Sequence, residues 1–224
     1  GYQMIGGYIV GPGVDFSGAN LTGADLSGTD LTGVISGNII GTPTLPSAYQ
    51  MINGYIVGPG AVLTAVDLSG ADLTNMNLSS ANLSDGADLS GANLTGVDLT
   101  GVDLTGANLT GVISGNITGT PTLPSGYQII SGYIVGPGAD LTDAVLRFAN
   151  LSDADLSGAD LTSADFTGAD LSGAGLTGVD LSGADLSGAD LTGADLTGAT
   201  LTGGISGSIA GIPTLPSVYQ MING

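Results

Sequence analysis

A five-residue repeat constrains the fold of this chain more than any other feature. The stretch GANLTGADLSGTDLTG at residues 18–33 repeats a small residue, Asp or Asn, Leu, Ser or Thr, and Gly every five positions. On an α-helix, positions five apart are rotated by roughly 140°, so Leu21, Leu26 and Leu31 would not share a face. On a continuous strand, an odd spacing would place successive leucines on opposite faces. The repeat therefore excludes one long helix and one long strand.

A solenoid that turns a corner once in each five-residue unit satisfies the pattern. Residues two apart share a side in an extended segment, so Ala19 and Leu21 would face inward and Asn20 outward. The Thr-Gly or Ser-Gly pair would form the corner, because Gly tolerates backbone angles that other residues resist. The repeat thus predicts an all-β fold of stacked coils.

The amino-acid composition fits such a solenoid, and it also indicates which kinds of binding partner are not expected. Of 224 residues 42% are hydrophobic, with 41 Gly, three Phe and no Trp or Cys, so the core would consist of Leu and small residues. All 20 acidic residues are Asp, Arg147 is the only basic residue, and the formal net charge is −19. Without a basic patch, direct binding of nucleic acid is not expected. Membrane insertion is not expected either, because no apolar run approaches the ~18 residues of a membrane helix.

Three blocks of five-residue units (pentads) alternate with a second, longer repeat. The pentad blocks occupy residues 14–32, 61–110 and 139–202. The longer repeat is complete at 33–60 and 111–138, and partial at 1–13 and 203–224. We expect these segments to form one continuous elongated solenoid, with the longer repeat as an inter-block module.

The inter-block module is predicted to contain a β-hairpin. Two apolar, β-prone runs, YQMI and YIV, are joined by Asn53-Gly54, and the equivalent dipeptides are Gly6-Gly7 and Ser131-Gly132. Such dipeptides suit a two-residue turn. Every Tyr and every Pro lies in a copy of this module. Because Tyr is enriched at interfaces, the candidate assembly residues are Tyr2, Tyr8, Tyr49, Tyr55, Tyr127, Tyr133 and Tyr219.

The two partial modules complement each other. Residues 203–224 stop where YIVGPG would follow, and residues 1–13 read GYQMIGGYIVGPG. Residue 224 would thus run on into another copy of the whole pattern. We expect that this chain is either one segment of a longer repeat array or a subunit that binds copies of itself head to tail.

The pentads resemble a known family. The segments ANLTGADLSG, VDLTGVDLTGANLTG and ADLSGADLTGADLTG are similar to the pentapeptide-repeat family, whose motif is A(D/N)LXX. The resemblance covers more than half of the chain and implies a right-handed quadrilateral β-helix, with four pentads to a coil. Gly at almost every last position and the Tyr/Pro modules depart from familiar members. The expected fold is therefore all-β, a right-handed quadrilateral β-helix (solenoid) interrupted by hairpin-like Tyr/Pro modules.

Four pentads per coil, as the resemblance implies, would stack residues 20 apart at about 4.8 Å. Stacked carboxylates repel, which would raise some pKa values or attract cations. The weak candidate calcium ligands in the third block are Asp140, Asp160, Asp180, Asp165, Asp185, Asp170 and Asp190. A hydrated acidic face that binds no metal is the simpler alternative, and no other cofactor is expected.

Arg147 and Phe148 interrupt the pentad pattern with a cation and an aromatic ring at a corner. We expect both side chains to face outward, with Arg147 paired to a neighbouring aspartate. Such a surface ion pair contributes little to stability.

The sequence offers little catalytic chemistry, because it contains no His, Cys, Lys or Glu, and no enzyme is expected. The leading hypothesis is a structural protein that forms an extended fibre, extracellular or at the cell surface, by end-to-end stacking of β-helical segments. An open solenoid end leaves strand backbone unpaired and favours such stacking. Two alternatives are an acidic DNA mimic or other protein-binding module, a role that the resemblance implies for some gyrase-binding members, and a calcium-binding, adhesin-like rod.

Overall fold

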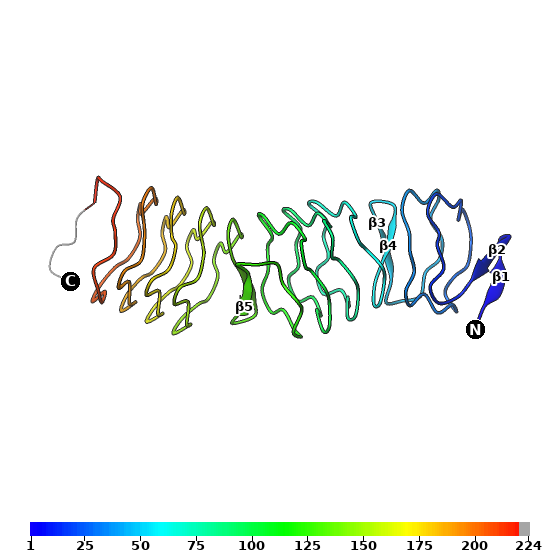
Figure 1. The fold of residues 1–224 in the computed structure, drawn as a ribbon, viewed down its shortest axis with the longest axis horizontal. Helices are drawn as coiled ribbons and strands as arrows, with labels where there is room; N and C mark the ends of the chain where they lie inside the picture. Colours follow the sequence, from blue (N-terminus) through cyan, green and yellow to red (C-terminus); the bar gives the residue numbers. More distant parts are fainter. Residues whose placement is uncertain (220–224) are drawn as a thin grey trace. The chain divides into compact units, whose positions relative to one another are not determined.

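The computed structural model describes residues 1–219 and divides the chain into two compact units. Unit 1 comprises Gly1–Asn108 and Thr118–Ser125, and unit 2 comprises Leu109–Ile117 and Gly126–Gly224. Each unit is a stack of β coils (Figure 1). Over residues 1–219 the regular elements are all strands, and no helix in that range is long and apolar enough to cross a membrane.

Backbone hydrogen bonds between residues about 20 apart hold the coils together. The Leu141 N–H donates to the Asp160 carbonyl at 2.8 Å, and the Asp160 N–H donates back to the Ala139 carbonyl at 3.0 Å. The resulting parallel bridge joins Asp140 to Asp160, and equivalent bridges recur through both units. Because a pentad has five residues, this register confirms four pentads to each coil.

Each pentad turns the chain through a corner, as the sequence predicts. The Ala24 N–H donates to the Leu21 carbonyl at 3.0 Å across Thr22 and Gly23, and Gly23 has a φ of 68°. A positive φ at this position is typical of a type II turn and explains the preference for Gly. Where another residue takes the position, the φ remains positive, as at Phe148 with 56°.

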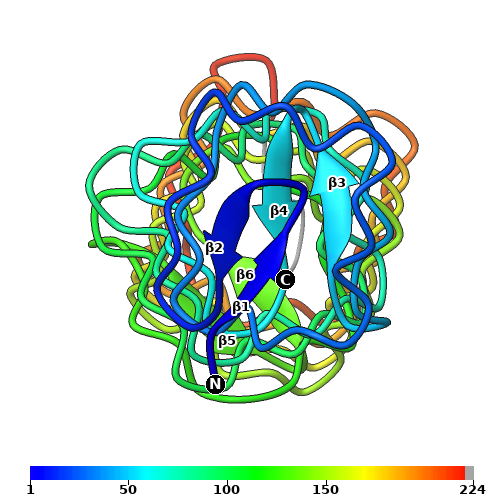
Figure 2. The same ribbon diagram turned by 90° about the vertical axis from the view of Figure 1, so that its right-hand side faces the viewer.

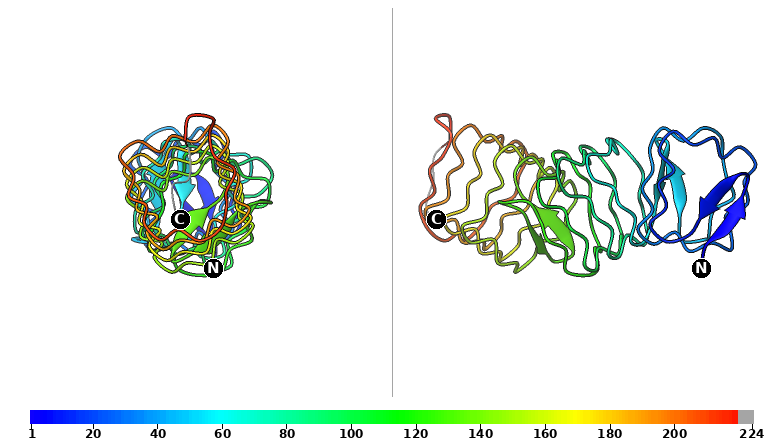
Figure 3. Two further views of the ribbon diagram at one scale, coloured as in Figure 1. Left: turned by 90° about the vertical axis from the view of Figure 1, so that its left-hand side faces the viewer. Right: turned by 45° about the vertical axis from the view of Figure 1, so that its right-hand side comes forward.

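The core consists of the central Leu or Phe of each pentad and the small residue two positions before it. Leu151, Leu156 and Leu161 are buried, and Phe166 takes the same place in the next pentad. In unit 2 these side chains form a single apolar cluster. Figure 3 shows the backbone coils that enclose the interior of the unit. Most of the 20 aspartates alternate with them along the chain and lie on the outside, so the inside–outside pattern predicted from the pentads is confirmed.

The spacing between bridged residues departs from 20 in the second pentad block and in the Tyr/Pro modules, where Ile35 bridges Val62 and Ile113 bridges Asp140, each 27 residues on. In the second block Asp72 bridges Asn93 and Asn77 bridges Asp98, both 21 residues apart, because Gly86 adds one residue to the pentad. In the Tyr/Pro modules Asp25 bridges Thr44, only 19 residues on. Within the pentad blocks the backbone ladder thus tolerates a one-residue insertion, whereas across each complete hairpin a single bridge continues it.

Each complete or N-terminal Tyr/Pro module contains an antiparallel hairpin with a two-residue turn, which confirms the sequence prediction. The hairpins are β1 (Gln3–Ile5) with β2 (Tyr8–Val10), β3 (Gln50–Ile52) with β4 (Tyr55–Val57), and β5 (Gln128–Ile130) with β6 (Tyr133–Val135). Within unit 1, β3 and β4 lie inside the outline of the coils (Figures 1 and 2). The burial of Ile56 and Val57 agrees, so this hairpin crosses the interior of the stack.

We expect Gly41→Ala to destabilise the chain more than Gly23→Ala. Both glycines have a positive φ, so either alanine costs about 1–2 kcal/mol in backbone strain. A Cβ at Gly41 would also lie 2.6 Å from the Thr22 Cα, whereas a Cβ at Gly23 meets nothing within 4 Å. Overpacking at Gly41 adds roughly 1–3 kcal/mol, which urea unfolding followed by circular dichroism would measure. Equal losses in the two variants would contradict the close coil approach.

Candidate functional site

The first tyrosine of each module closes the base of its hairpin. The Tyr49 hydroxyl donates to the Pro59 carbonyl at 2.7 Å, and the Tyr127 hydroxyl donates to the Pro137 carbonyl at 2.6 Å. The Tyr49 ring lies over Gly58, where an added Cβ would be 2.8 Å from the ring Cγ. Partial burial raises the pKa of the Tyr49 and Tyr127 phenols above the usual value.

The second tyrosine of a module fixes the hairpin to the coil that follows it. The Tyr133 hydroxyl accepts from the Val145 N–H at 3.1 Å, and the Tyr8 hydroxyl accepts from the Asn20 N–H at 3.1 Å. The Tyr8 ring also meets Phe16 edge to face, with 6.2 Å between ring centroids. The hairpin is therefore held from its C-terminal side by the next pentad block.

Buried serine hydroxyls hold the other side of the complete hairpins. The Ile56 N–H donates to the Ser36 Oγ at 2.8 Å, and the Ile134 N–H donates to the Ser114 Oγ at 2.9 Å. Each serine lies 20 residues before its partner, in the coil that precedes the hairpin. The sequence analysis missed these serines, although the shared segment GVISGN in both modules was a signal for them.

The preceding coil also contacts the hairpin turn. The Ile39 N–H donates to the Gly54 carbonyl at 3.2 Å, and the Ile117 N–H donates to the Gly132 carbonyl at 2.9 Å. With the serine bonds, these contacts repeat the same docking geometry once in each unit. Each complete hairpin is thus bound between the coil before it and the coil after it.

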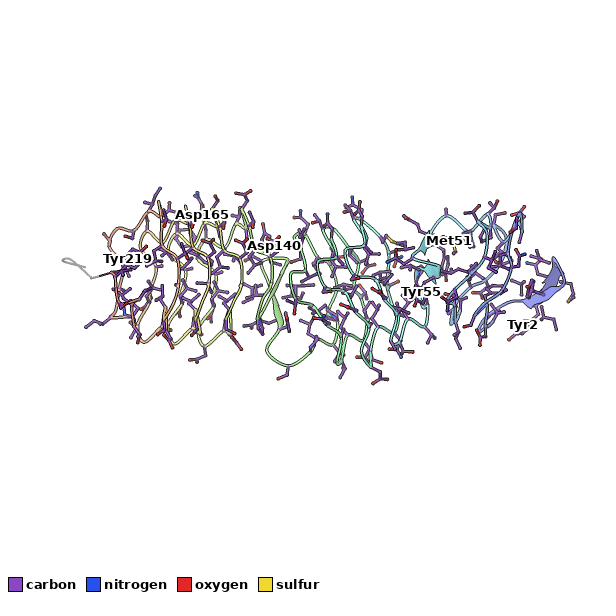
Figure 4. The ribbon with its side chains drawn as sticks, turned by 90° about the horizontal axis from the view of Figure 1, so that it is seen from above. Tyr2, Met51, Tyr55, Asp140, Asp165 and Tyr219 are labelled. Atoms are coloured by element: carbon purple, nitrogen blue, oxygen red, sulfur yellow. The ribbon has the colours of Figure 1, made fainter. Side chains whose placement is uncertain are left out.

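The seven candidate assembly tyrosines lie in different environments. Tyr49, Tyr55, Tyr127 and Tyr133 are half-buried inside their own chain. Figure 4 labels Tyr55 on β4 and Met51 on the paired strand β3. Tyr2 lies on the first hairpin and is exposed, although its hydroxyl donates to the Pro12 carbonyl at 3.0 Å. Tyr8 is half-buried against Phe16, and Tyr219 lines a hollow in unit 2. A role of these tyrosines in assembly stays a prediction.

The structure stacks the candidate calcium ligands as the resemblance to the pentapeptide-repeat family implies. Parallel bridges join Asp140 to Asp160 and Asp160 to Asp180, and the other two columns are Asp165 with Asp185 and Asp170 with Asp190. Over residues 1–219, however, no three acidic side chains gather into a group that could hold a metal ion. Calcium binding stays a prediction.

Each aspartate in these columns is bound to its own turn. The Asp160 Oδ1 accepts from the Thr162 N–H at 3.0 Å and from the Thr162 hydroxyl at 2.6 Å. Asn150 makes the same two contacts with Ser152, at 3.0 and 2.7 Å. Either Asp or Asn can occupy this position, because both side chains supply the Oδ1 oxygen that accepts the hydrogen bonds of the turn.

These hydrogen bonds contradict the expected upward shift in carboxyl pKa. The Ser187 hydroxyl and N–H hold the pKa of Asp185 below its usual value, and the nearby Asp165 charge raises it by a smaller amount. The pKa of Asp170 is lowered by Ser172 in the same way. For these carboxyls the expectation was wrong, because hydrogen bonds to the ionised carboxylate outweigh repulsion between well-solvated charges.

Arg147 forms an ion pair with Asp165, as the sequence predicts. Phe148 is exposed, and its ring lies over Gly168 of the next coil. Asp165 lies on the coil after that of Arg147 and is labelled with Asp140 in Figure 4. The Arg147 side chain is largely exposed to solvent, so this ion pair adds little to the stability of the fold.

Comparison of the sequence with protein families gives one assignment. The family described as pentapeptide repeats matches in 8 copies, over residues 12–35, 60–85, 85–111, 139–178 and 166–203. These ranges cover more than half of the chain. The chain belongs to the pentapeptide-repeat family. Its coils accordingly form a right-handed quadrilateral β-helix, and the expected fold class is confirmed.

Several solved structures resemble this pentapeptide-repeat protein. HetL from the cyanobacterium Nostoc sp., involved in heterocyst differentiation regulation, is 33% identical over 89% of this chain and 85% of its own, with a TM-score of 0.36. A pentapeptide repeat protein of the Arabidopsis thaliana thylakoid lumen is 32% identical over 34% and 58%, with a TM-score of 0.30. QnrB1, a plasmid-mediated fluoroquinolone resistance protein, is 22% identical over 66% and 81%, with a TM-score of 0.31. No curated protein matches the sequence.

We expect the thermal stability of this protein to fall as the pH drops below about 4. Carboxyl groups whose pKa is lowered in the folded state stabilise it above their unfolded pKa, and this contribution is lost as pH falls through the folded pKa. Repulsion within a chain of net charge −19 would have the opposite effect, because it weakens as the carboxylates are protonated. Melting temperatures from pH 7 to pH 2 measure the balance. A rising melting temperature below pH 4 would show that repulsion dominates.

Proposed function

We propose that this protein is structural and that its β-helical segments stack end to end into a filament. The observation that carries the proposal is a hollow of about 170 Å³ in the last described coils of unit 2. Its lining includes Leu191, Leu196, Leu201, Ile209 and Leu215. In unit 2 up to residue 219 no helix covers this apolar surface. An apolar hollow of this kind favours binding of another strand or coil.

The distribution of charge supports association through the ends. All 20 aspartates lie in the three pentad blocks, and the four modules contain none. Their lowered pKa values keep Asp170, Asp180 and Asp195 ionised at neutral pH. Repulsion between like-charged flanks opposes side-by-side association. Contact through the neutral modules avoids that cost.

Two further features of the sequence support an extracellular or cell-surface location and the absence of enzymatic activity. The chain has one basic residue, Arg147, as a target for trypsin-like proteases, and its neighbours are bound into the ladder by the Leu146 and Phe148 N–H groups. A hydrogen-bonded backbone opens rarely and resists proteolysis. The residues that usually carry acid–base or nucleophilic catalysis are absent from the sequence, apart from Asp, Ser, Thr and Tyr.

Electron microscopy of the purified chain at neutral pH tests the proposed function. We expect filaments whose length grows with protein concentration and which persist in a calcium chelator. Loss of filaments on chelation would instead support the calcium-binding rod. Single particles at every concentration would contradict the structural proposal, and binding of those particles to a type II topoisomerase at low salt would support the acidic DNA mimic.

A further inference from the structure

One pentad of unit 2, with the sequence AVLRF, departs from the repeat on its outer side alone. Ala144 and Leu146 are 1% and 0% exposed, as expected for the inward positions of a pentad. Val145 stands where most pentads of the third block carry Asp or Asn. Arg147 stands where the others carry Ser or Thr, and Phe148 where most carry Gly. The inward pair thus conforms to the repeat, whereas all three outward residues differ from it.

Phe148 occupies a position that is unfavourable for its side chain. Its φ of 56° is left-handed, and every other non-glycine residue with a positive φ in residues 1–219 is Ala, Asn, Asp or Ser. A bulky residue in this region is a genuine outlier. The Phe148 side chain is 78% exposed, so burial in its own chain offers little compensation. Strained residues of this kind concentrate at sites of ligand contact.

Val145 also gives up a local contact without being buried. It has no side-chain acceptor, so it cannot provide the hydrogen bond that the Asp160 Oδ1 provides to the Thr162 N–H. Nevertheless, Val145 is 57% exposed. Local rules that are broken without a gain inside the chain mark candidate functional positions. Val145 and Phe148 together therefore indicate a surface that another molecule covers.

The next coil supports the Phe148 ring from one edge. A Cβ at Gly168 would lie 2.6 Å from both Cδ1 and Cε1 of the ring, so the ring rests against backbone that has no side chain. The rest of the ring is open to solvent. Asp143 and Asp153 occupy the corners before and after Phe148, and both are exposed. The ring is therefore an aromatic platform with acidic neighbours.

We propose that Phe148 and Val145 form a docking site for an arginine side chain that a partner protein presents. The planar guanidinium stacks on the exposed part of the Phe148 ring, and the aliphatic stem of the arginine covers Val145. The carboxylates of Asp143 and Asp153 attract the approaching cation. The site involves neither the Tyr/Pro modules nor the hollow of unit 2, so it is independent of the proposed end-to-end stacking.

Charge and size favour this occupant over the alternatives. A chain of net charge −19 repels nucleic acid and anionic lipid. A second copy would bring 20 aspartates and a single arginine, Arg147, which is already paired with Asp165. Two exposed apolar side chains offer far less area than the roughly 1,200 Å² of a stable protein interface, which suits one inserted side chain. Lysine fits less well, because its ammonium group is more strongly hydrated and cannot stack.

Peptide titration followed by nuclear magnetic resonance tests the site. The probes are acetyl-Gly-Arg-Gly-Arg-Gly-amide and its lysine counterpart, at an ionic strength of about 0.15 M. We expect Phe148→Gly to weaken binding of the arginine peptide roughly threefold or more, because the exposed cation–π contact is lost. Ser163→Gly is the matched control, since Ser163 is also an exposed corner residue with a positive φ, and it should leave binding unchanged. The lysine peptide should bind both variants and the unmodified chain equally weakly.

Melting curves separate this site from a structural role of the ring. We expect Phe148→Gly to melt at the same temperature as the unmodified chain or higher, because glycine relieves the left-handed strain. A lower melting temperature would show that the ring stabilises its own chain and would overturn the proposal. Equal binding of the arginine peptide by Phe148→Gly and the unmodified chain would also overturn it, and would assign the attraction to the aspartate columns alone. Neither outcome bears on filament formation, which electron microscopy measures separately.

Discussion

The parallel hydrogen-bond ladder between successive coils is the constraint on which the rest of the structure depends. It requires a corner in each pentad, which places Gly or another residue with positive φ after Ser or Thr. It turns every Leu toward the interior and most of the Asp or Asn outward. On the outside, the carboxylate or amide oxygen accepts a hydrogen bond from the turn that follows it, as Asp160 does from the Thr162 N–H. One backbone pattern thus dictates the residue type at each of the five positions.

The Tyr/Pro modules resolve a problem that such a ladder creates. A stack of identical coils has no intrinsic end and no fixed place for a partner. In each unit a hairpin is bound from one side by a serine hydroxyl and from the other by a buried valine, as with Ser114 and Val135. A two-faced element of this kind joins two stretches of solenoid and carries no charge.

The pentad period was sufficient to predict the coils and the buried leucines, because local chemistry repeats at every unit. The stacked columns, such as Asp140 with Asp160, followed from the four pentads per coil that the family resemblance implies. The turn dipeptide at Asn53-Gly54 was likewise readable, since two positive φ values are needed there. The path of the hairpin through the interior was not readable. It depends on the pairing of Ser36 with Ile56, which only three-dimensional stacking brings together. The pKa of Asp185 was mispredicted because the sequence shows the neighbouring charges but not the competing hydrogen bonds.

X-ray diffraction from aligned native material would test most directly whether the ladder continues from one copy to the next. Successive coils are spaced by the ordinary strand separation of about 4.8 Å along the direction in which they stack. End-to-end stacking of the β-helical segments predicts a strong reflection at this spacing on the meridian, parallel to the filament axis. The same reflection on the equator, with the coils stacked across the filament, would contradict assembly through the ends.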